Sequence, residues 1–188
     1  MLRWLAVVVA LLVALGGVED VWAGALTITG AAPGNFSTTL SGLRQTVYTT
    51  LGTYQAADTT GTNQGWNITF QATRFTCSAG VGACPVGGNS LPLNSLVMAP
   101  PTVSCATGTL CILTSAPPTI TMTQNTPIDS TSAVKVASAA LLTGSGTYDF
   151  TPGTVDATAG HNLSLAVPSW TYATTYTSTV TVSIGVGP

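Results

Sequence analysis

Charged side chains are scarce in this sequence, which has 4 lysines and arginines and 6 aspartates and glutamates among 188 residues. Beyond residue 23 the cations are Arg44, Arg74 and Lys135. A nucleic-acid-binding protein needs a basic stripe to neutralise phosphates, and three scattered cations cannot form one. The same scarcity excludes attachment to anionic lipid by charge attraction. We therefore expect no nucleic-acid partner, and no membrane partner once a targeting segment has been removed.

Groupings of catalytic or metal-binding residues are also missing. His161 is the one histidine, and a lone histidine is more often structural than a general base. The carboxylates beyond residue 23 are dispersed and suggest no glycosidase pair; they lie at Asp58, Asp129, Asp149 and Asp156. The tetrapeptide SAVK at 132–135 matches the SxxK motif of penicillin-recognising enzymes, but no SDN-like or KTG-like motif accompanies it. We predict a protein that is not an enzyme and that has no metal site and no cofactor.

A long apolar run occurs at the N-terminus alone. Arg3 precedes the apolar stretch WLAVVVALLVALGG, which leads to small residues. This is the order of a secretory signal peptide, with cleavage after Ala23 or nearby. A membrane anchor is the competing interpretation, but the run is short for a bilayer and two acidic residues follow it at once. We expect residues 1–23 to be a signal peptide and 24–188 to be one secreted domain, with no LPxTG-like signal for covalent attachment to a wall.

Helix signals are nearly absent beyond residue 23, whereas alternating strand patterns are frequent. The clearest alternations occupy residues 66–72 and 176–186. The apolar face consists of Trp66, Ile68, Phe70 and Ala72 in the first run and of Tyr176, Val180, Val182, Ile184 and Val186 in the second. Further strand patterns span 25–29, 45–58 with Gly52 as a bulge, 119–123 and 161–168. Residues 132–142 could form a short helix, but their central Val-Lys-Val alternation favours a strand. Turns rich in Gly, Pro and Asn separate the runs, so we predict an all-β, antiparallel β-sandwich or barrel-like single domain.

Four cysteines lie close together in the chain, at Cys77, Cys84, Cys105 and Cys111. An even number in a secreted chain predicts disulfides, and the CxxC spacing of a structural zinc site is missing. The simplest pairing joins Cys77 to Cys84 and Cys105 to Cys111, although three connectivities are possible. Because the segment 77–118 is also rich in Pro and Gly, we expect it to be an irregular, disulfide-stapled insertion.

Aromatic side chains are what the sequence offers for binding. Trp66 is in phase with Ile68 and Phe70, which favours a place in the core. Trp170 and Tyr172 belong to the segment PSWTY beside a proline, where core and exposed positions are both open. Aromatic rings stack on sugar faces, so an uncharged surface of aromatic, Thr and Asn side chains suits a glycan.

The run GWNITF at 65–70 resembles the first signature of the WxL-domain family of bacterial cell-surface proteins. In that family a strand carries Trp-x-Leu shortly after a turn that contains Asp and Gly. Trp66 takes the Trp place and Ile68 the Leu place, and Asp58, Gly61 and Gly65 fit the preceding turn. The segments ALTITGAAPGNF and NLSLAVP also resemble strands of the family, so the resemblance spans nearly the whole chain beyond residue 23.

The family's second signature reads Tyr-xxx-Leu-Thr-Trp-x-Leu-xxx-Pro, and this chain ends YTSTVTVSIGVGP. Tyr176, Thr181 and Pro188 fall in register with it. Val180 and Ile184 stand in the two Leu places. The signature Trp is replaced by Val182, and the cysteine-containing insertion at 77–118 is not part of the family pattern.

The resemblance implies noncovalent attachment to a bacterial cell wall, through peptidoglycan or another wall glycan. The candidate binding residues are Trp66, Ile68, Tyr176, Trp170 and Tyr172. The alternative is a structural or adhesive module that docks onto another cell-surface protein, for example by adding a strand to a sheet edge. Loss of the second signature Trp at Val182 slightly favours that alternative.

Overall fold

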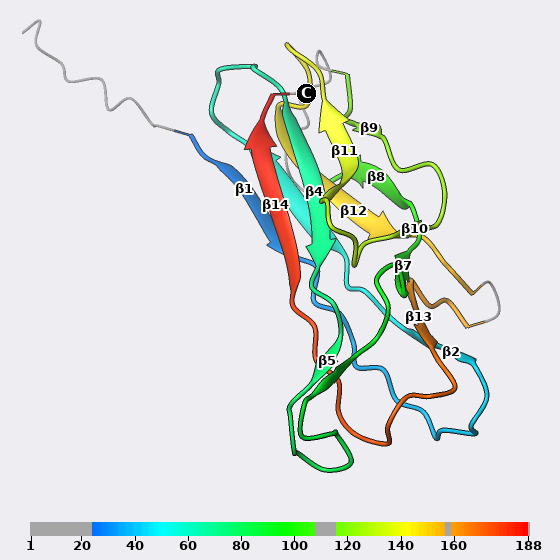
Figure 1. Ribbon diagram of the computed structural model, residues 1–188. Coiled ribbons are helices and arrows are strands. Elements are labelled where there is room, and N and C mark those ends of the chain that lie inside the picture. The colour runs from blue at the N-terminus through cyan, green and yellow to red at the C-terminus, as the bar shows by residue number, and fades with distance from the viewer. Residues whose placement is uncertain (1–23, 108–115, 157–158, 188) are drawn as a thin grey trace, which may run out of the picture.

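The computed structural model describes residues 24–107, 116–156 and 159–187. Within these ranges the chain forms strands β1 to β14, and it contains no helix that could cross a membrane. The strands build three four-stranded antiparallel sheets, and a short pair, β5 (Thr76–Cys77) with β6 (Asn89–Ser90), stands apart from them. The prediction of an all-β, antiparallel fold is therefore confirmed (Figure 1).

Two of the sheets pack face to face as a sandwich (Figure 1). The β1 sheet has the order β1 (Leu26–Gly30), β3 (Tyr54–Asp58), β12 (Gly146–Pro152), β8 (Pro101–Cys105). The β4 sheet has the order β14 (Val180–Val186), β4 (Trp66–Ala72), β11 (Val134–Ala139), β9 (Thr119–Ile120). Each main strand forms because its side chains alternate between the core and the outside, most regularly in β4.

Aromatic rings fill the space between these two sheets. Tyr54 of the β1 sheet stacks on Phe150, with ring centroids 5.1 Å apart, and reaches Phe70 of the β4 sheet at 5.2 Å. Trp66 of the β4 sheet meets Phe150 edge-on at 6.3 Å. All four side chains are almost completely buried. This aromatic cluster is the centre of the hydrophobic core.

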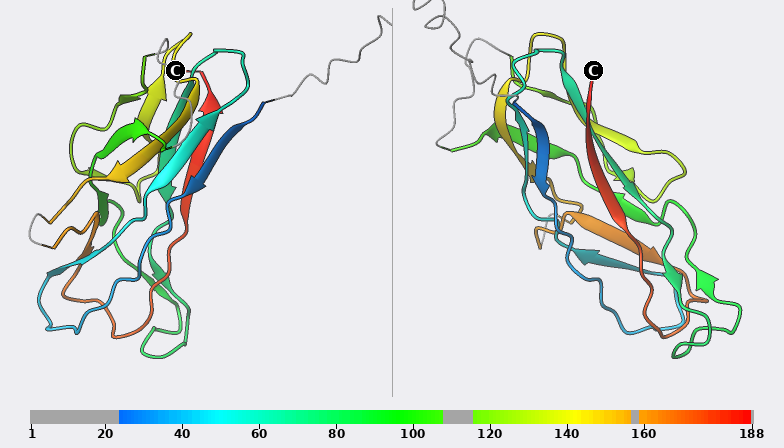
Figure 2. Two further views of the ribbon diagram at one scale, coloured as in Figure 1. Left: turned by 180° about the vertical axis from the view of Figure 1, so that it is seen from behind. Right: turned by 90° about the vertical axis from the view of Figure 1, so that its left-hand side faces the viewer.

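The third sheet extends the β1 sheet along the long axis of the molecule. This β13 sheet has the order β10 (Thr126–Pro127), β7 (Leu96–Met98), β13 (Leu163–Val167), β2 (Gln45–Thr49). Strands β2 and β3, β7 and β8, and β12 and β13 are consecutive in the chain, and the lateral order of the partners is the same in both sheets. Figure 2 shows the result, a long layer of which β14 and β4 face one part.

Several strand boundaries differ from the predicted ones. The run 45–58 is two strands, β2 and β3, because the chain passes from the β13 sheet to the β1 sheet between them, and Gly52 lies in this connection. The run 119–123 pairs only at Thr119–Ile120, and the last strand begins at Val180 instead of 176. The strand expected within 132–142 is present as β11.

The segment 77–118 is more regular than the sequence suggested. It contains β7 and β8, which pair with β13 and β12 respectively. Leu91, Leu96 and Met98 from this segment are almost completely buried. Within the described part of this segment, the irregular stretch is mainly the loop between β5 and β6. Residues 108–115 lie outside the described residues.

The two segments that resemble family signatures are neighbouring strands. β14 pairs with β4 over seven residues, which places Val186 opposite Trp66, Ile184 opposite Ile68 and Val182 opposite Phe70. Val182 is half-buried and packs against the core. The residue that replaces the signature Trp therefore contributes to the packing of the sandwich edge.

Candidate binding site

A cleft of about 1060 Å³ lies over the inner face of the β13 sheet. Its floor is apolar because alternate side chains of the sheet strands point to the same side; the floor consists of Val47, Leu96, Leu163, Leu165 and Val167. These side chains are buried and belong to the same hydrophobic core as the sandwich. Strands β4 and β14 do not extend over them, since β4 ends at Ala72 and β14 begins at Val180.

Three irregular segments take the place of the missing sheet and form the walls of the cleft. They are 33–40, 75–91 and 171–178, each contributing side chains to the lining. Figures 1 and 2 show these segments gathered at the end of the molecule opposite to the C-terminal end of β14. Phe36 of the first segment packs edge-on against Phe75 of the second, with ring centroids 6.2 Å apart. The walls therefore share a small apolar cluster of their own.

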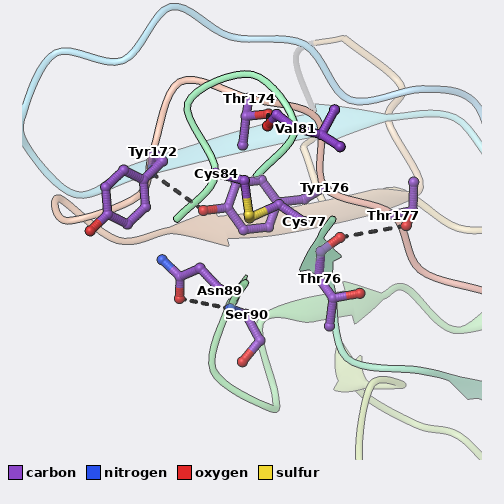
Figure 3. Close-up of a disulfide and its surroundings, with 10 residues drawn as sticks. All are labelled: Thr76, Cys77, Val81, Cys84, Asn89, Ser90, Tyr172, Thr174, Tyr176 and Thr177. Carbon is purple, nitrogen blue, oxygen red and sulfur yellow. Dashed lines mark hydrogen bonds between the residues drawn. A yellow bond between two sulfur atoms is a disulfide. The ribbon is translucent and has the colours of Figure 1, made fainter. Parts of the chain in front are cut away.

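The segment 171–178, here called the tyrosine loop, brings two predicted binding residues into the cleft. Tyr172 and Tyr176 both line it, and the backbone N–H of Tyr172 donates a hydrogen bond of 3.3 Å to the Tyr176 hydroxyl (Figure 3). Tyr172 is 44% exposed, whereas Tyr176 is half-buried and packs against the core. One ring is thus held by the protein and the other is available to a ligand.

A disulfide-closed loop faces the tyrosine loop. Cys77 and Cys84 are bonded, as the simplest pairing predicted. Within this loop the carbonyl of Val81 accepts a hydrogen bond of 3.2 Å from the Thr174 hydroxyl. Nearby, the backbones of Thr76 and Thr177 exchange two hydrogen bonds, and the Thr177 hydroxyl donates one of 3.5 Å to the Thr76 carbonyl (Figure 3). Cys105 is also disulfide-bonded, and Cys111 lies outside the described residues.

The lining of the cleft is uncharged. Among the described residues that form it, none is Asp, Glu, Lys, Arg or His. Hydroxyl groups supply the polarity around the apolar floor, from Ser37, Thr38, Thr39, Thr171, Thr174, Thr175, Thr177 and Ser178 together with the two tyrosines. Such a surface suits a neutral ligand with apolar faces and hydroxyl or amide edges, because it offers no countercharge to an ion.

The other predicted binding residues lie elsewhere. Trp66 and Ile68 are 0% exposed, and neither lines the cleft. The Trp66 indole N–H donates a hydrogen bond of 2.9 Å to the carbonyl of Gly144. Trp170 is 52% exposed but lines a separate, smaller pocket. The structure therefore brings Tyr172 and Tyr176 together and separates both of them from Trp66, Ile68 and Trp170.

The described acidic and basic side chains and the histidine lie outside the cleft. His161 stacks on Tyr48 and approaches Asp156, with 3.5 Å between imidazole Nδ1 and carboxylate Oδ2. Asp129 is completely buried, which raises the pKa of its carboxyl, while the N–H groups of Leu96 and Ser95 act in the opposite direction. In the described ranges no three His, Cys, Asp or Glu side chains gather as metal ligands would.

Sequence reasoning missed the segment 33–40 and the floor of the cleft. The floor residues carry the same alternation as any core strand, so nothing in the pattern of β13 shows that loops instead of a second sheet pack over one of its faces. The wall containing Phe36 has no strand periodicity. Both belong to the site only because chain segments far apart in the sequence meet there.

Comparison with known proteins gives one match. A family model described as WxL domain surface cell wall-binding matches residues 24–188, which includes every described residue. No curated protein and no solved structure matches the chain.

Proposed function

Because the chain belongs to the WxL family of surface cell wall-binding domains, we propose that it is a secreted protein that binds peptidoglycan noncovalently through the cleft beside the tyrosine loop. The family is one of wall-binding domains and not of enzymes. Peptidoglycan is the proposed ligand, the cleft its binding place, and secretion the route by which the protein reaches the wall.

The uncharged cleft carries this proposal. Glycan chains have apolar ring faces and hydroxyl and acetamido edges, and proteins bind them with aromatic rings and neutral hydrogen-bonding groups. Tyr172 presents such a ring at the mouth of the cleft, and threonine and serine hydroxyls surround the apolar floor. The sugar rings of a glycan strand, with their apolar faces and their hydroxyl and acetamido edges, fit this lining.

Secretion is supported by the sequence and the cysteine chemistry. The apolar stretch before Ala23 has the order of a signal peptide. The Cys77–Cys84 disulfide is of the kind that persists in oxidising surroundings outside the cytosol. A wall-binding domain must reach the outside of the cell, so both features agree with the proposed location.

In this proposal the signature residue Trp66 builds the domain and Tyr172 contacts the wall. Trp66 is enclosed by aromatic neighbours and by the carbonyl of Gly144. A buried indole stabilises the sandwich, and the sandwich supports the strands that form the cleft floor.

Docking onto another surface protein by strand addition is the second candidate, and it receives less support. β14 is a seven-residue edge strand that a partner strand could extend, because it pairs only with β4 among the described strands. However, β1 lies next to β14 along this edge (Figure 1). A partner strand could pair there only if β1 moved aside.

Cosedimentation with purified Gram-positive sacculi tests the proposal. We expect the wild-type protein to pellet with the sacculi, and Tyr172→Ala to weaken binding about tenfold, as loss of a stacking aromatic does. Tyr48→Ala is the matched control, because Tyr48 is 40% exposed and lies outside the cleft. Circular dichroism establishes that both variants are folded.

Two results would contradict the proposal. If folded wild-type protein stays in the supernatant, peptidoglycan is not the ligand and a protein partner becomes the next candidate. If Tyr48→Ala weakens binding as much as Tyr172→Ala, the ligand does not sit in this cleft.

A further inference from the structure

A second pocket, of about 300 Å³, opens on the opposite face of the β13 sheet. It is lined by Arg44, Pro92, Leu93, Asn94, Ser95, Ala166, Pro168 and Trp170. Ala166 alternates with Leu165 and Val167, which point into the large cleft, so its own side chain points the other way. The two pockets therefore flank the segment 166–178 from its two sides.

This second pocket is lined by a cation, Arg44, that has no ion-pair partner among the described residues. Arg44 is exposed, and no carboxylate of the described residues forms an ion pair with it. The buried carboxylate of Asp129 is committed elsewhere, since its two oxygens accept hydrogen bonds of 2.9 Å from the N–H groups of Ser95 and Leu96. In a chain with so few charges, it is a specific feature that a guanidinium without an ion-pair partner among the described residues lines the same pocket as an exposed indole.

The 92–96 turn, which contributes part of the pocket lining, is held by several hydrogen bonds. The Ser95 hydroxyl donates to the carbonyl of Pro92 at 2.7 Å, and the Ser95 carbonyl accepts from the N–H of Ala166 at 2.9 Å. Together with the bonds to Asp129, these contacts fix the 92–96 turn against β13. A preorganised pocket loses less entropy when a ligand binds.

We infer that this pocket binds a carboxylate-bearing wall component, with the carboxylate on Arg44 and an apolar sugar face on the indole of Trp170. A guanidinium recognises a carboxylate through paired N–H donors, and an exposed indole is a stacking surface for a sugar ring. An acidic amino sugar offers both features in one small molecule. The choice of a wall ligand rests on the proposed function, whereas the pairing of arginine and tryptophan does not.

Nuclear magnetic resonance titration of the Trp170 indole N–H signal tests the inference. The signal is identified among the 4 tryptophans of the chain by its loss in Trp170→Phe. N-acetylmuramic acid and N-acetylglucosamine are the matched probes, because they differ in the lactyl group that carries the carboxylate. We expect N-acetylmuramic acid to bind about five- to tenfold more tightly, as a charge-assisted hydrogen-bonded pair provides.

Two matched arginine variants show which arginine causes the preference for N-acetylmuramic acid. Arg44→Gln should lower the affinity for N-acetylmuramic acid to that for N-acetylglucosamine, while Arg74→Gln, an exposed arginine outside both pockets, should change neither. N-acetyl-D-alanine separates the two sources of the carboxylate: its binding at the same signal would assign the pocket to the end of a wall peptide, and its failure to bind would assign it to the sugar.

Equal affinities for the two sugars, or an undiminished preference in Arg44→Gln, would overturn the inference. This outcome is distinguishable from failure of the proposed function. The titration uses soluble probes and reports on the Trp170 pocket alone, whereas sedimentation of Tyr172→Ala with sacculi reports on the large cleft.

Discussion

The indole Nε1 of Trp66 donates a hydrogen bond of 2.9 Å to the carbonyl oxygen of Gly144, which lies 78 residues further along the chain. The bond is completely buried, and it links the start of β4 to the turn that leads into β12 of the facing sheet. A buried indole N–H without an acceptor would cost about 1–3 kcal/mol. The signature tryptophan therefore fixes one sheet of the sandwich against the other.

The first prediction compares the two tryptophans beyond residue 23. Trp66→Ala should lower the free energy of unfolding by about 3–5 kcal/mol, because it opens a large cavity in the core. Trp170→Ala should change it by less than about 1 kcal/mol, since this side chain is half exposed. Urea unfolding of both variants measures the difference. Similar losses in the two variants would contradict the placement of Trp66 at the centre of the core.

A second prediction concerns the residue that accepts the indole hydrogen bond. Gly144 has φ near +74°, and a Cβ there would lie 2.2 Å from Cβ of Ala139 and 2.9 Å from Nε1 of Trp66. Gly144→Ala should therefore destabilise the protein by at least about 2 kcal/mol, through strain and displacement of the indole.

Gly42→Ala is the matched control for this change. Gly42 has φ near +75° and nothing within 4 Å of its added Cβ. Gly42→Ala should therefore lower the free energy of unfolding only through backbone strain at positive φ, by about 1 kcal/mol. Thermal unfolding of the two variants separates the steric term from the backbone term. Equal losses would show that the Trp66–Gly144 contact is not tight.

The third prediction concerns two buried tyrosines. The hydroxyl of Tyr54 is buried and has no hydrogen-bond partner among the described residues, whereas that of Tyr148 donates to the carbonyl of Ser145 at 3.1 Å. Tyr54→Phe should keep or raise the free energy of unfolding, by up to about 1 kcal/mol, and Tyr148→Phe should lower it by about 0.5–1.5 kcal/mol. Urea unfolding at neutral pH gives both values.

The buried phenol of Tyr54 also predicts that the stability of the protein depends on pH in the alkaline range. Burial raises the pKa of the Tyr54 phenol above its ordinary value of 10.0. The folded state then holds this proton more tightly than the unfolded state. The contribution of the protonated phenol to the free energy of unfolding is therefore complete below pH 10 and is lost as the pH rises above it. Tyr54→Phe should therefore become increasingly more stable than the wild type above pH 10. An unchanged difference between neutral and alkaline pH would contradict the burial of this hydroxyl.

The fourth prediction concerns the disulfide loop that faces the tyrosine loop. Cys77→Ser with Cys84→Ser should lower the free energy of unfolding by about 2 kcal/mol, because the short loop is no longer closed. It should also weaken binding to sacculi, because the disulfide no longer holds the loop that places Val81 in the lining of the cleft. Thr174→Val, which removes the hydrogen bond to the Val81 carbonyl, should weaken binding in the same direction and by less. Unchanged sedimentation of a folded double variant would place the ligand away from this wall.

The sequence by itself determined the class of the fold and the role of its most regular strands. Alternation between core and surface is a local property of an extended chain, so the faces of β4 and β13 could be assigned without knowing their neighbours. The same alternation placed Trp66 with Ile68 and Phe70 in the core, and the short spacing of Cys77 and Cys84 favoured the bond that the structure contains. The family resemblance rested on these same local patterns.

Only the tertiary structure decided which strands are neighbours and where a ligand can enter. Strand pairing depends on contacts between distant segments, so the sequence could not show that 45–58 passes through two sheets, or that the two signature strands lie side by side. The same limit applied to Trp170 and Tyr172, two residues apart in one loop, which line different pockets. The cleft itself exists because the β4 sheet is shorter than the layer it covers, and the length of one layer relative to another is a property of the assembled domain.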